Sequence, residues 1–135
     1  WDASIAFIDR YAADLARQYG LEFRTNTEGV KTPVHLSPPK RRDLYLAAKE
    51  VLQNIVEHAG ARTVNLVAHT VKGALVLRIT DDGVGDRSSS GGGQGLLNIR
   101  KRIERWNGSV RMDRQEPLGT AVVIALPLDE HHPNA

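Results

Sequence analysis

The chain has 135 residues, of which 41% are hydrophobic and 25% charged, and it contains no cysteine. A chain of this size can form one domain with its own core, without disulfides or a structural metal ion. The formal charge of +2 is too small, and the basic residues too scattered, for a nucleic-acid-binding groove. No apolar run approaches the ~20 residues of a membrane-spanning helix, and the first residues do not resemble a secretory signal, so we expect no direct membrane contact.

The amino-terminal part predicts a helix, a strand and a loop. Apolar residues recur every three or four positions over 3–19, the spacing of one helix face, and Gly20 marks the end of that helix. Residues 21–26 alternate apolar and polar side chains, as a half-buried strand does. The prolines between 33 and 39 then predict a loop.

A long central helix is predicted from 40 to 58. Its apolar residues keep to one side and are Leu44, Ala48, Val51, Leu52, Ile55 and Val56. Two strand-like runs follow at 63–70 and 74–80. The link 71–73 between them contains a glycine and predicts a hairpin.

The next segment, 86–93, has no apolar side chain, and we expect it to form a mobile flap. Helical spacing resumes at Leu96 and ends by Gly108. Residues 110–115 and 120–126 predict a final hairpin.

This order of elements predicts an α+β fold. Strands joined by short turns pair antiparallel, and each of about three amphipathic helices has one face to cover. A two-layer sandwich, with a mixed, mostly antiparallel sheet covered on one face by helices, satisfies both conditions. We expect a single domain over 1–128 and a disordered tail over 129–135.

The first polar motif lies on the central helix. Glu50, Asn54 and His58 are four residues apart, so a regular helix places them on one face, and that face is not the apolar one. A polar stripe of this kind is by itself typical of a solvated helix face.

The second motif is Asp81-Asp82-Gly83-Val84-Gly85, at the end of a predicted strand. A carboxylate fixed at a strand end, followed by glycines that let backbone approach a ligand, is a plausible purine site. Aspartate followed by glycine is also common in tight turns, so this motif alone leaves both interpretations open.

The third motif is the glycine-rich run 91–95, which opens into the helix that begins with Leu96. Backbone N–H groups and the positive end of the helix dipole suit a polyphosphate at such a position. A flexible loop without a ligand has the same composition.

Together the three motifs resemble the N, G1 and G2 boxes of the GHKL ATPases, the Bergerat-fold superfamily that includes histidine kinases, DNA gyrase and MutL. The resemblance covers 44–128. Residues 50–59 and 95–103 look like the corresponding helices of histidine kinases whose regulators carry NarL-type DNA-binding domains, and Gly119-Thr120 is similar to their closing strand.

The resemblance implies ATP and Mg²⁺ as ligands. By position, Asn54 would hold Mg²⁺ through its amide oxygen, Glu50 would act as general base on an attacking histidine, and Asp81 would accept a hydrogen bond from the adenine 6-amino group. Thr120 would close the adenine pocket. The residues implied to contact the nucleotide are Asn54, His58, Asp81, Gly83, Val84, Gly85, Gly93, Gly95, Leu96 and Thr120.

One position departs from the resembled pattern. Glu57 stands where these kinases usually carry a basic residue facing the phosphates. A like charge at ~6 Å and an effective dielectric near 20 costs ~3 kcal/mol before screening, so either Glu57 turns away or nucleotide affinity is low. A substitute cation is available among Arg100, Lys101 and Arg102.

The function implied is that of the catalytic, ATP-binding domain of a two-component sensor histidine kinase. No histidine of the chain lies on a predicted helical hairpin, so the phosphoacceptor is expected on a separate dimerisation domain, with a response regulator as an indirect partner. The expected location is the cytoplasm, and the sequence leaves open whether the parent protein is anchored in a membrane. The alternatives are a degenerate nucleotide-sensing or protein-binding module of the same superfamily and a serine kinase of the anti-sigma-factor type.

Overall fold

The computed structural model describes residues 3–84, 93–115 and 118–129. Within these ranges the elements are α1 (Ala3–Tyr19), β1 (Glu22–Gly29), α2 (Pro38–Asn54), the π-helical turn η1 (Ile55–Ala59), β2 (Thr63–Val71), β3 (Ala74–Asp81), α3 (Gly93–Glu104), β4 (Ser109–Arg114) and β5 (Thr120–Pro127). The predicted flap falls almost wholly outside the described residues. Among the described residues, no helix is long and apolar enough to cross a membrane.

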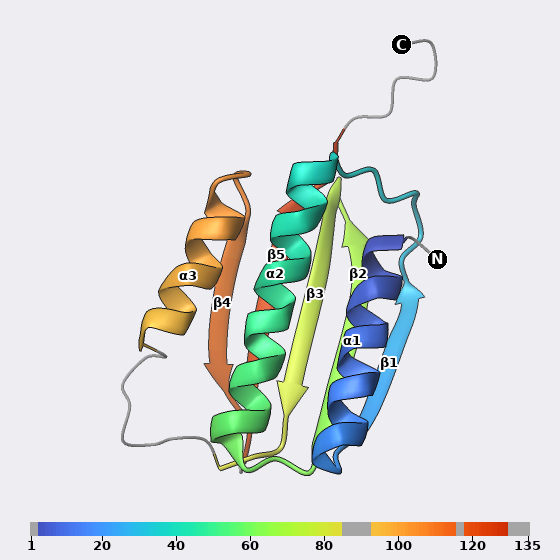
Figure 1. Ribbon diagram of the computed structural model, residues 1–135. Coiled ribbons are helices and arrows are strands. Elements are labelled where there is room, and N and C mark those ends of the chain that lie inside the picture. Colours follow the sequence, from blue (N-terminus) through green and yellow to red (C-terminus); the bar gives the residue numbers. More distant parts are fainter. Residues whose placement is uncertain (1–2, 85–92, 116–117, 130–135) are drawn as a thin grey trace.

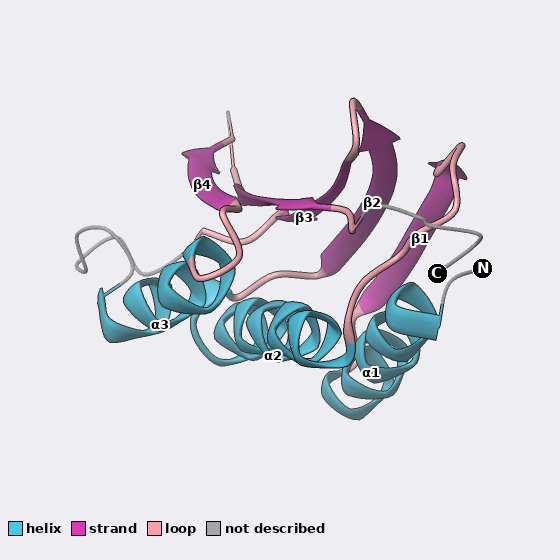
Figure 2. Ribbon diagram, turned by 90° about the horizontal axis from the view of Figure 1, so that it is seen from above, coloured by secondary structure: helices cyan, strands magenta, loops and turns pink. Residues whose placement is uncertain are grey.

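In the described part of the chain, five strands form one sheet in the order β1-β2-β3-β5-β4. β1 runs parallel to β2, and the other neighbouring pairs are antiparallel. Figure 2 shows α1, α2 and α3 side by side against one face of the sheet, and among the described residues the opposite face carries no helix. The predicted two-layer α+β sandwich with a mixed, mostly antiparallel sheet is confirmed.

The core lies between the helices and the sheet. Alternate residues of the central strands point toward the helices, and Leu77 on β3 and Ile124 on β5 are fully buried register partners. α2 approaches the sheet closely because its inner face carries small residues, including Ala47 and Ala48, which are also fully buried. The apolar periodicity of α2 therefore positions this helix over the middle of the sheet.

The central helix differs from the prediction at its end. The regular α-helix stops at Asn54, and the chain continues through η1 to Gly60, which adopts a left-handed conformation with φ of 63°. Ala59 at the end of η1 packs against the backbone of Gly83, where a Cβ atom would collide with the Ala59 carbonyl oxygen. The turn thus brings the end of the helix directly against the segment that follows β3.

The beginning of the predicted tail is ordered. The Asp129 carboxylate accepts hydrogen bonds from the Ser37 backbone N–H (2.6 Å) and from Lys40 Nζ (2.9 Å), and the Asp129 N–H donates to the His35 carbonyl oxygen (2.8 Å). The hydrogen bond from Lys40 is the main reason why the pKa of Asp129 lies below its ordinary value. Disorder from Asp129 onward was therefore wrong for this residue, and 130–135 lie outside the described residues.

Candidate functional site

Three predicted motifs meet at one end of the molecule. In Figure 1 the end of β3, the end of α2 and the beginning of α3 all lie at the lower end, because α3 runs antiparallel to α2. β5 begins at the same end, since it pairs antiparallel with β3. The topology therefore brings together segments that lie far apart in the sequence, from Asn54 at the end of α2 to Thr120 at the start of β5, which their order along the chain does not reveal.

Asp81 is buried at the end of β3, with 8% of its surface exposed. Its register partners are Thr120 on β5 and Val64 on β2. Register partners point to the same face of a sheet, so Asp81 and Thr120 stand side by side on the helix-covered face. The resemblance implies both residues for the adenine pocket, and the strand register makes them neighbours.

The Asp81 carboxylate is only partly satisfied. Oδ1 accepts a hydrogen bond from the Gly83 N–H at 2.8 Å, and among the described residues no other group donates to this side chain. Burial raises the pKa of Asp81, and the bond from Gly83 opposes that shift. Among the described residues Oδ2 has no donor and is not fully buried, so a ligand donor can reach it.

Two glycines surround Asp81 for steric reasons. A side chain at Gly83 would collide with Ala59, as described above, and a Cβ at Gly119 would collide with the Asp81 carbonyl oxygen. Gly119 has φ of 112°, a conformation that residues with a Cβ rarely adopt. The sequence analysis explained Gly83 by close approach to a ligand, whereas the structure explains it by close packing of the protein's own backbone.

Asp82 has a structural role that the sequence did not reveal. Its Oδ1 accepts hydrogen bonds from the backbone N–H groups of Arg62 (2.8 Å) and Thr63 (2.9 Å). The bond from Thr63 is the largest cause that lowers the pKa of Asp82. Of the two adjacent carboxylates, one ties down the start of β2 and only Asp81 remains for a ligand.

A groove of about 240 Å³ runs between α2 and α3. It is lined by Leu46, Lys49, Glu50, Gln53, Asn98, Ile99 and Arg102. Glu50 and Asn54 are both half-buried, and among the described residues no hydrogen bond reaches either side chain. Asn54 ends the α-helix one turn beyond Glu50 and does not line this groove.

His58 lies beyond the end of the regular α-helix. It belongs to the π-helical turn η1, in which each residue turns the chain through a smaller angle than in an α-helix. Its side chain is 61% exposed, and Nε2 lies 3.7 Å from Glu57 Oε2. The face that His58 shares with Glu50 and Asn54 therefore stays a prediction.

The glycine-rich motif agrees with its predicted position at a helix start. α3 begins at Gly93, three residues earlier than the predicted first helical residue Leu96, so Gly93, Gly95 and Leu96 belong to its first turn. Backbone N–H groups of a first turn have no partner within the helix. Val84 is exposed, and Gly85 lies outside the described residues.

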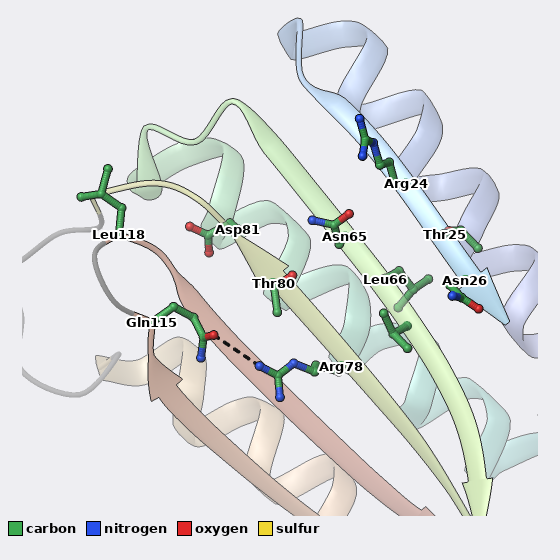
Figure 3. Close-up of a pocket in the computed structure, with 11 residues that line it drawn as sticks. Arg24, Thr25, Asn26, Asn65, Leu66, Arg78, Thr80, Asp81, Gln115 and Leu118 are labelled. Atoms are coloured by element: carbon green, nitrogen blue, oxygen red, sulfur yellow. Dashed lines mark hydrogen bonds between the residues drawn. The ribbon is translucent and has the colours of Figure 1, made fainter. Parts of the chain in front are cut away.

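A larger hollow of about 720 Å³ lies on the helix-free face of the sheet (Figure 3). Its lining includes Arg24, Asn65, Arg78, Thr80 and Gln115, and Arg78 donates a hydrogen bond to Gln115 at 3.3 Å. Asp81, at the strand end, is the one predicted site residue on its rim. The hollow is larger than the groove, but the motif residues gather on the helix-covered side, so volume does not identify the site.

Known proteins resemble this chain in sequence. The model of a family described as histidine kinase-, DNA gyrase B- and HSP90-like ATPases matches residues 39–130. The sensor histidine kinase DesK of Bacillus subtilis is 32% identical over 102 residues, which are 74% of this chain and 27% of DesK. UhpB of Salmonella typhimurium, a histidine-protein kinase/phosphatase, is 36% identical over 93 residues, 68% of this chain and 18% of UhpB. The chain thus spans about a quarter or less of these relatives.

Solved structures share the fold. The histidine kinase domain of the EL346 blue-light activated kinase from Erythrobacter litoralis has a TM-score of 0.73 at 23% identity, covering 91% of this chain and 60% of that chain. Full-length ShkA in complex with AMPPNP has a TM-score of 0.77 at 17% identity, covering 97% of this chain and 31% of that chain. At these identities the likeness concerns the architecture.

Proposed function

We infer the function from the premise that this chain belongs to the family of histidine kinase-, DNA gyrase B- and HSP90-like ATPases. Membership confirms the resemblance drawn from the three motifs, and with it the expectation of an ATP-binding domain. The curated relatives are sensor histidine kinases, which fits the expected subfamily. We propose that the chain is the catalytic domain of such a kinase and transfers the γ-phosphoryl group of ATP to a histidine on a separate dimerisation domain.

Asp81 is the observation that carries this proposal. It is a mostly buried carboxylate beside Thr120, and its second oxygen has no hydrogen-bond donor among the described residues. The adenine 6-amino group is a donor that fits such an acceptor, whereas guanine would place a carbonyl oxygen against it. An unsatisfied buried polar group costs ~1–3 kcal/mol, which favours ATP over GTP by roughly tenfold or more.

The residues of α2 fit the phosphate end of the ligand. When bound, Mg²⁺ supplies positive charge to the phosphates; the Asn54 amide oxygen would be its protein ligand. Among the described residues no group of three His, Cys, Asp or Glu side chains is placed to hold a metal, which agrees with an ion held mainly by phosphates and water. Glu50 would accept the proton of the incoming histidine imidazole, and its carboxylate has no other partner among the described residues.

The acceptor histidine is proposed to belong to a partner domain. His35 lies in a loop, His58 in η1 and His69 in β2, so none of these three lies on a helical hairpin. A response regulator would receive the phosphoryl group from that partner rather than from this chain. We place the domain in the cytoplasm, where ATP and the regulator are available.

Calorimetric titration with a non-hydrolysable ATP analogue, with and without Mg²⁺, tests the proposal. We expect saturable binding that Mg²⁺ strengthens. Asp81→Asn should lose about tenfold or more in affinity, because the amide oxygen keeps the Gly83 bond and the amide nitrogen then faces the adenine donor. Asp14→Asn, on the exposed side of α1, is the matched control and should bind like the wild type. Absence of binding by the wild type at millimolar nucleotide would overturn the proposal.

Phosphotransfer chemistry separates the remaining candidates. Incubation with ATP and the histidine-bearing dimerisation domain of the parent protein should yield acid-labile phosphohistidine. Acid-stable phosphoserine on a protein substrate would instead support a serine kinase of the anti-sigma-factor type. The second candidate is a degenerate module of the same superfamily, because Glu57 places a negative charge where the resembled kinases carry a basic residue. Nucleotide binding without any phosphotransfer would support that alternative.

A further inference from the structure

The candidate phosphate site has an unusual balance of charge. ATP brings several negative charges, and α2 with η1 adds the carboxylates of Glu50 and Glu57 within two helical turns. Among the described residues that line the α2–α3 groove, only Lys49 and Arg102 carry positive charge. If the groove receives phosphate, one of these two cations must offset the carboxylates.

Lys49 is directed toward α1. Its Nζ lies 5.5 Å from the centroid of the Tyr11 ring, a cation–π arrangement. Burial is the main cause that raises the pKa of Tyr11, and Glu57 adds a smaller part. The hydrogen bond with Gln53, which lies one turn after Lys49 on α2, opposes this rise. Lys49 is therefore engaged by Tyr11, and Glu57, whose carboxylate lies 3.7 Å from His58 Nε2, supplies no positive charge.

Arg102 is held at the groove by a buried carboxylate. Its guanidinium lies 3.3 Å from Asp43, whose side chain is 8% exposed and also receives bonds from Trp106 Nε1 (2.8 Å) and Arg105 (3.3 Å). The Arg102 side chain is 40% exposed, and only one of its terminal nitrogens is used in this contact among the described residues. The remaining N–H groups are available to a ligand in the groove.

The other basic residues of this helix do not qualify. Arg100 and Lys101 are exposed and do not line the groove, and Arg105, which also does not line it, follows the last residue of α3. Glu50, the proposed base, lines the same groove as Arg102, whereas Asp81 does not. The groove thus corresponds to the end of ATP that is furthest from adenine.

We propose that Arg102, positioned by Asp43, binds the terminal phosphate of ATP and supplies the positive charge that Glu57 does not. The inference rests on the proposed function, because it presumes that ATP binds at this site. Arg102 would be a binding residue. Asp43 would be a positioning residue that acts only through Arg102 and through the placement of α3.

Binding of ATP, ADP and AMP to Arg102→Gln tests the proposal. We expect ATP affinity to fall about tenfold, the scale of one charge-assisted hydrogen bond, while ADP and AMP change less than about twofold. Arg102→Lys should keep part of the ATP preference. Arg100→Gln, which removes an exposed charge from the same helix, is the control and should bind all three nucleotides normally.

The outcomes are distinguishable from a failure of the proposed function. Equal loss of all three nucleotides in Arg102→Gln, or no loss of any, would overturn the role of Arg102 while leaving ATP binding intact. Absence of nucleotide binding in the wild type would overturn the proposed function itself. Thermal unfolding of each variant shows whether it is folded. If Arg102→Gln does not fold, the same comparison of ATP, ADP and AMP affinity is made with Arg102→Lys, which retains the charge near Asp43.

Discussion

The two ends of the candidate site are built differently. The adenine end is set by strand register: Asp81 and Thr120 are paired across β3 and β5, and the backbone of Gly119 passes too close for any side chain. The phosphate end is set by two helices whose relative position depends on polar contacts around Asp43. Recognition of the base should therefore tolerate little change in the backbone of the two strands, whereas phosphate affinity should respond gradually to changes in α3.

The largest effect is expected from Gly119→Ala, which strains the adenine end. The new Cβ would meet the Asp81 carbonyl oxygen in a backbone conformation with φ of 112°. We expect a loss of about 2–4 kcal/mol in the free energy of unfolding, measured by urea denaturation, together with loss of nucleotide binding. Gly20→Ala is the matched control, since Gly20 also has positive φ (71°) but a Cβ there would meet nothing within 4 Å. Equal destabilisation by both substitutions would contradict a special role of the contact at Gly119.

Asp43→Ala should have the next largest effect and act on the phosphate end. The substitution leaves Trp106 Nε1 and two guanidinium groups without their carboxylate, and we expect a loss of about 2 kcal/mol in the free energy of unfolding. The ratio of ATP to ADP affinity should also fall. Asp113→Ala removes an exposed carboxylate paired with Arg111 and should cost about 0.5 kcal/mol or less. If the ratio of ATP to ADP affinity were unchanged in Asp43→Ala, Asp43 would contribute to the stability of the fold and not to the binding of phosphate.

The raised pKa of Asp81 predicts a pH dependence for the adenine end. Burial makes the ionised form less favourable in the folded protein, so the stability contribution of this carboxyl is greatest below its unfolded pKa and is lost as pH rises through the folded pKa. Base binding has the opposite sign, because the acceptor form is the ionised one. Adenosine carries no phosphate that titrates, so its affinity can be followed by NMR over a range of pH. Because the pKa of Asp81 is raised, this affinity should begin to fall at a higher pH than it would for an aspartate of ordinary pKa. A profile identical in Asp81→Asn would contradict this assignment.

The sequence was informative where a local pattern decides the structure. Helical and alternating periodicity located all the described elements, because one buried face per element fixes the pattern of apolar residues. It failed at η1, because apolar periodicity continues through Ile55 and Val56 and does not distinguish a π-helical turn from an α-helix. It also missed Asp43, whose partners Arg102, Arg105 and Trp106 become neighbours only when α3 packs on α2. Residues whose role arises from such packing carry no signal in the local pattern.

The smallest effect is expected from Glu57→Lys, although this substitution restores the sign found in the resembled pattern. Glu57 is exposed, and its charge adds a small part to the raised pKa of Tyr11. ATP affinity should change by less than about threefold, since solvent screens the charge of an exposed side chain. The Tyr11 pKa should instead fall, because a like charge is replaced by an opposite one, and absorbance titration of the tyrosines would detect this. A large gain in ATP affinity would mean that position 57 faces the phosphates after all, and it would transfer to that position the role proposed for Arg102.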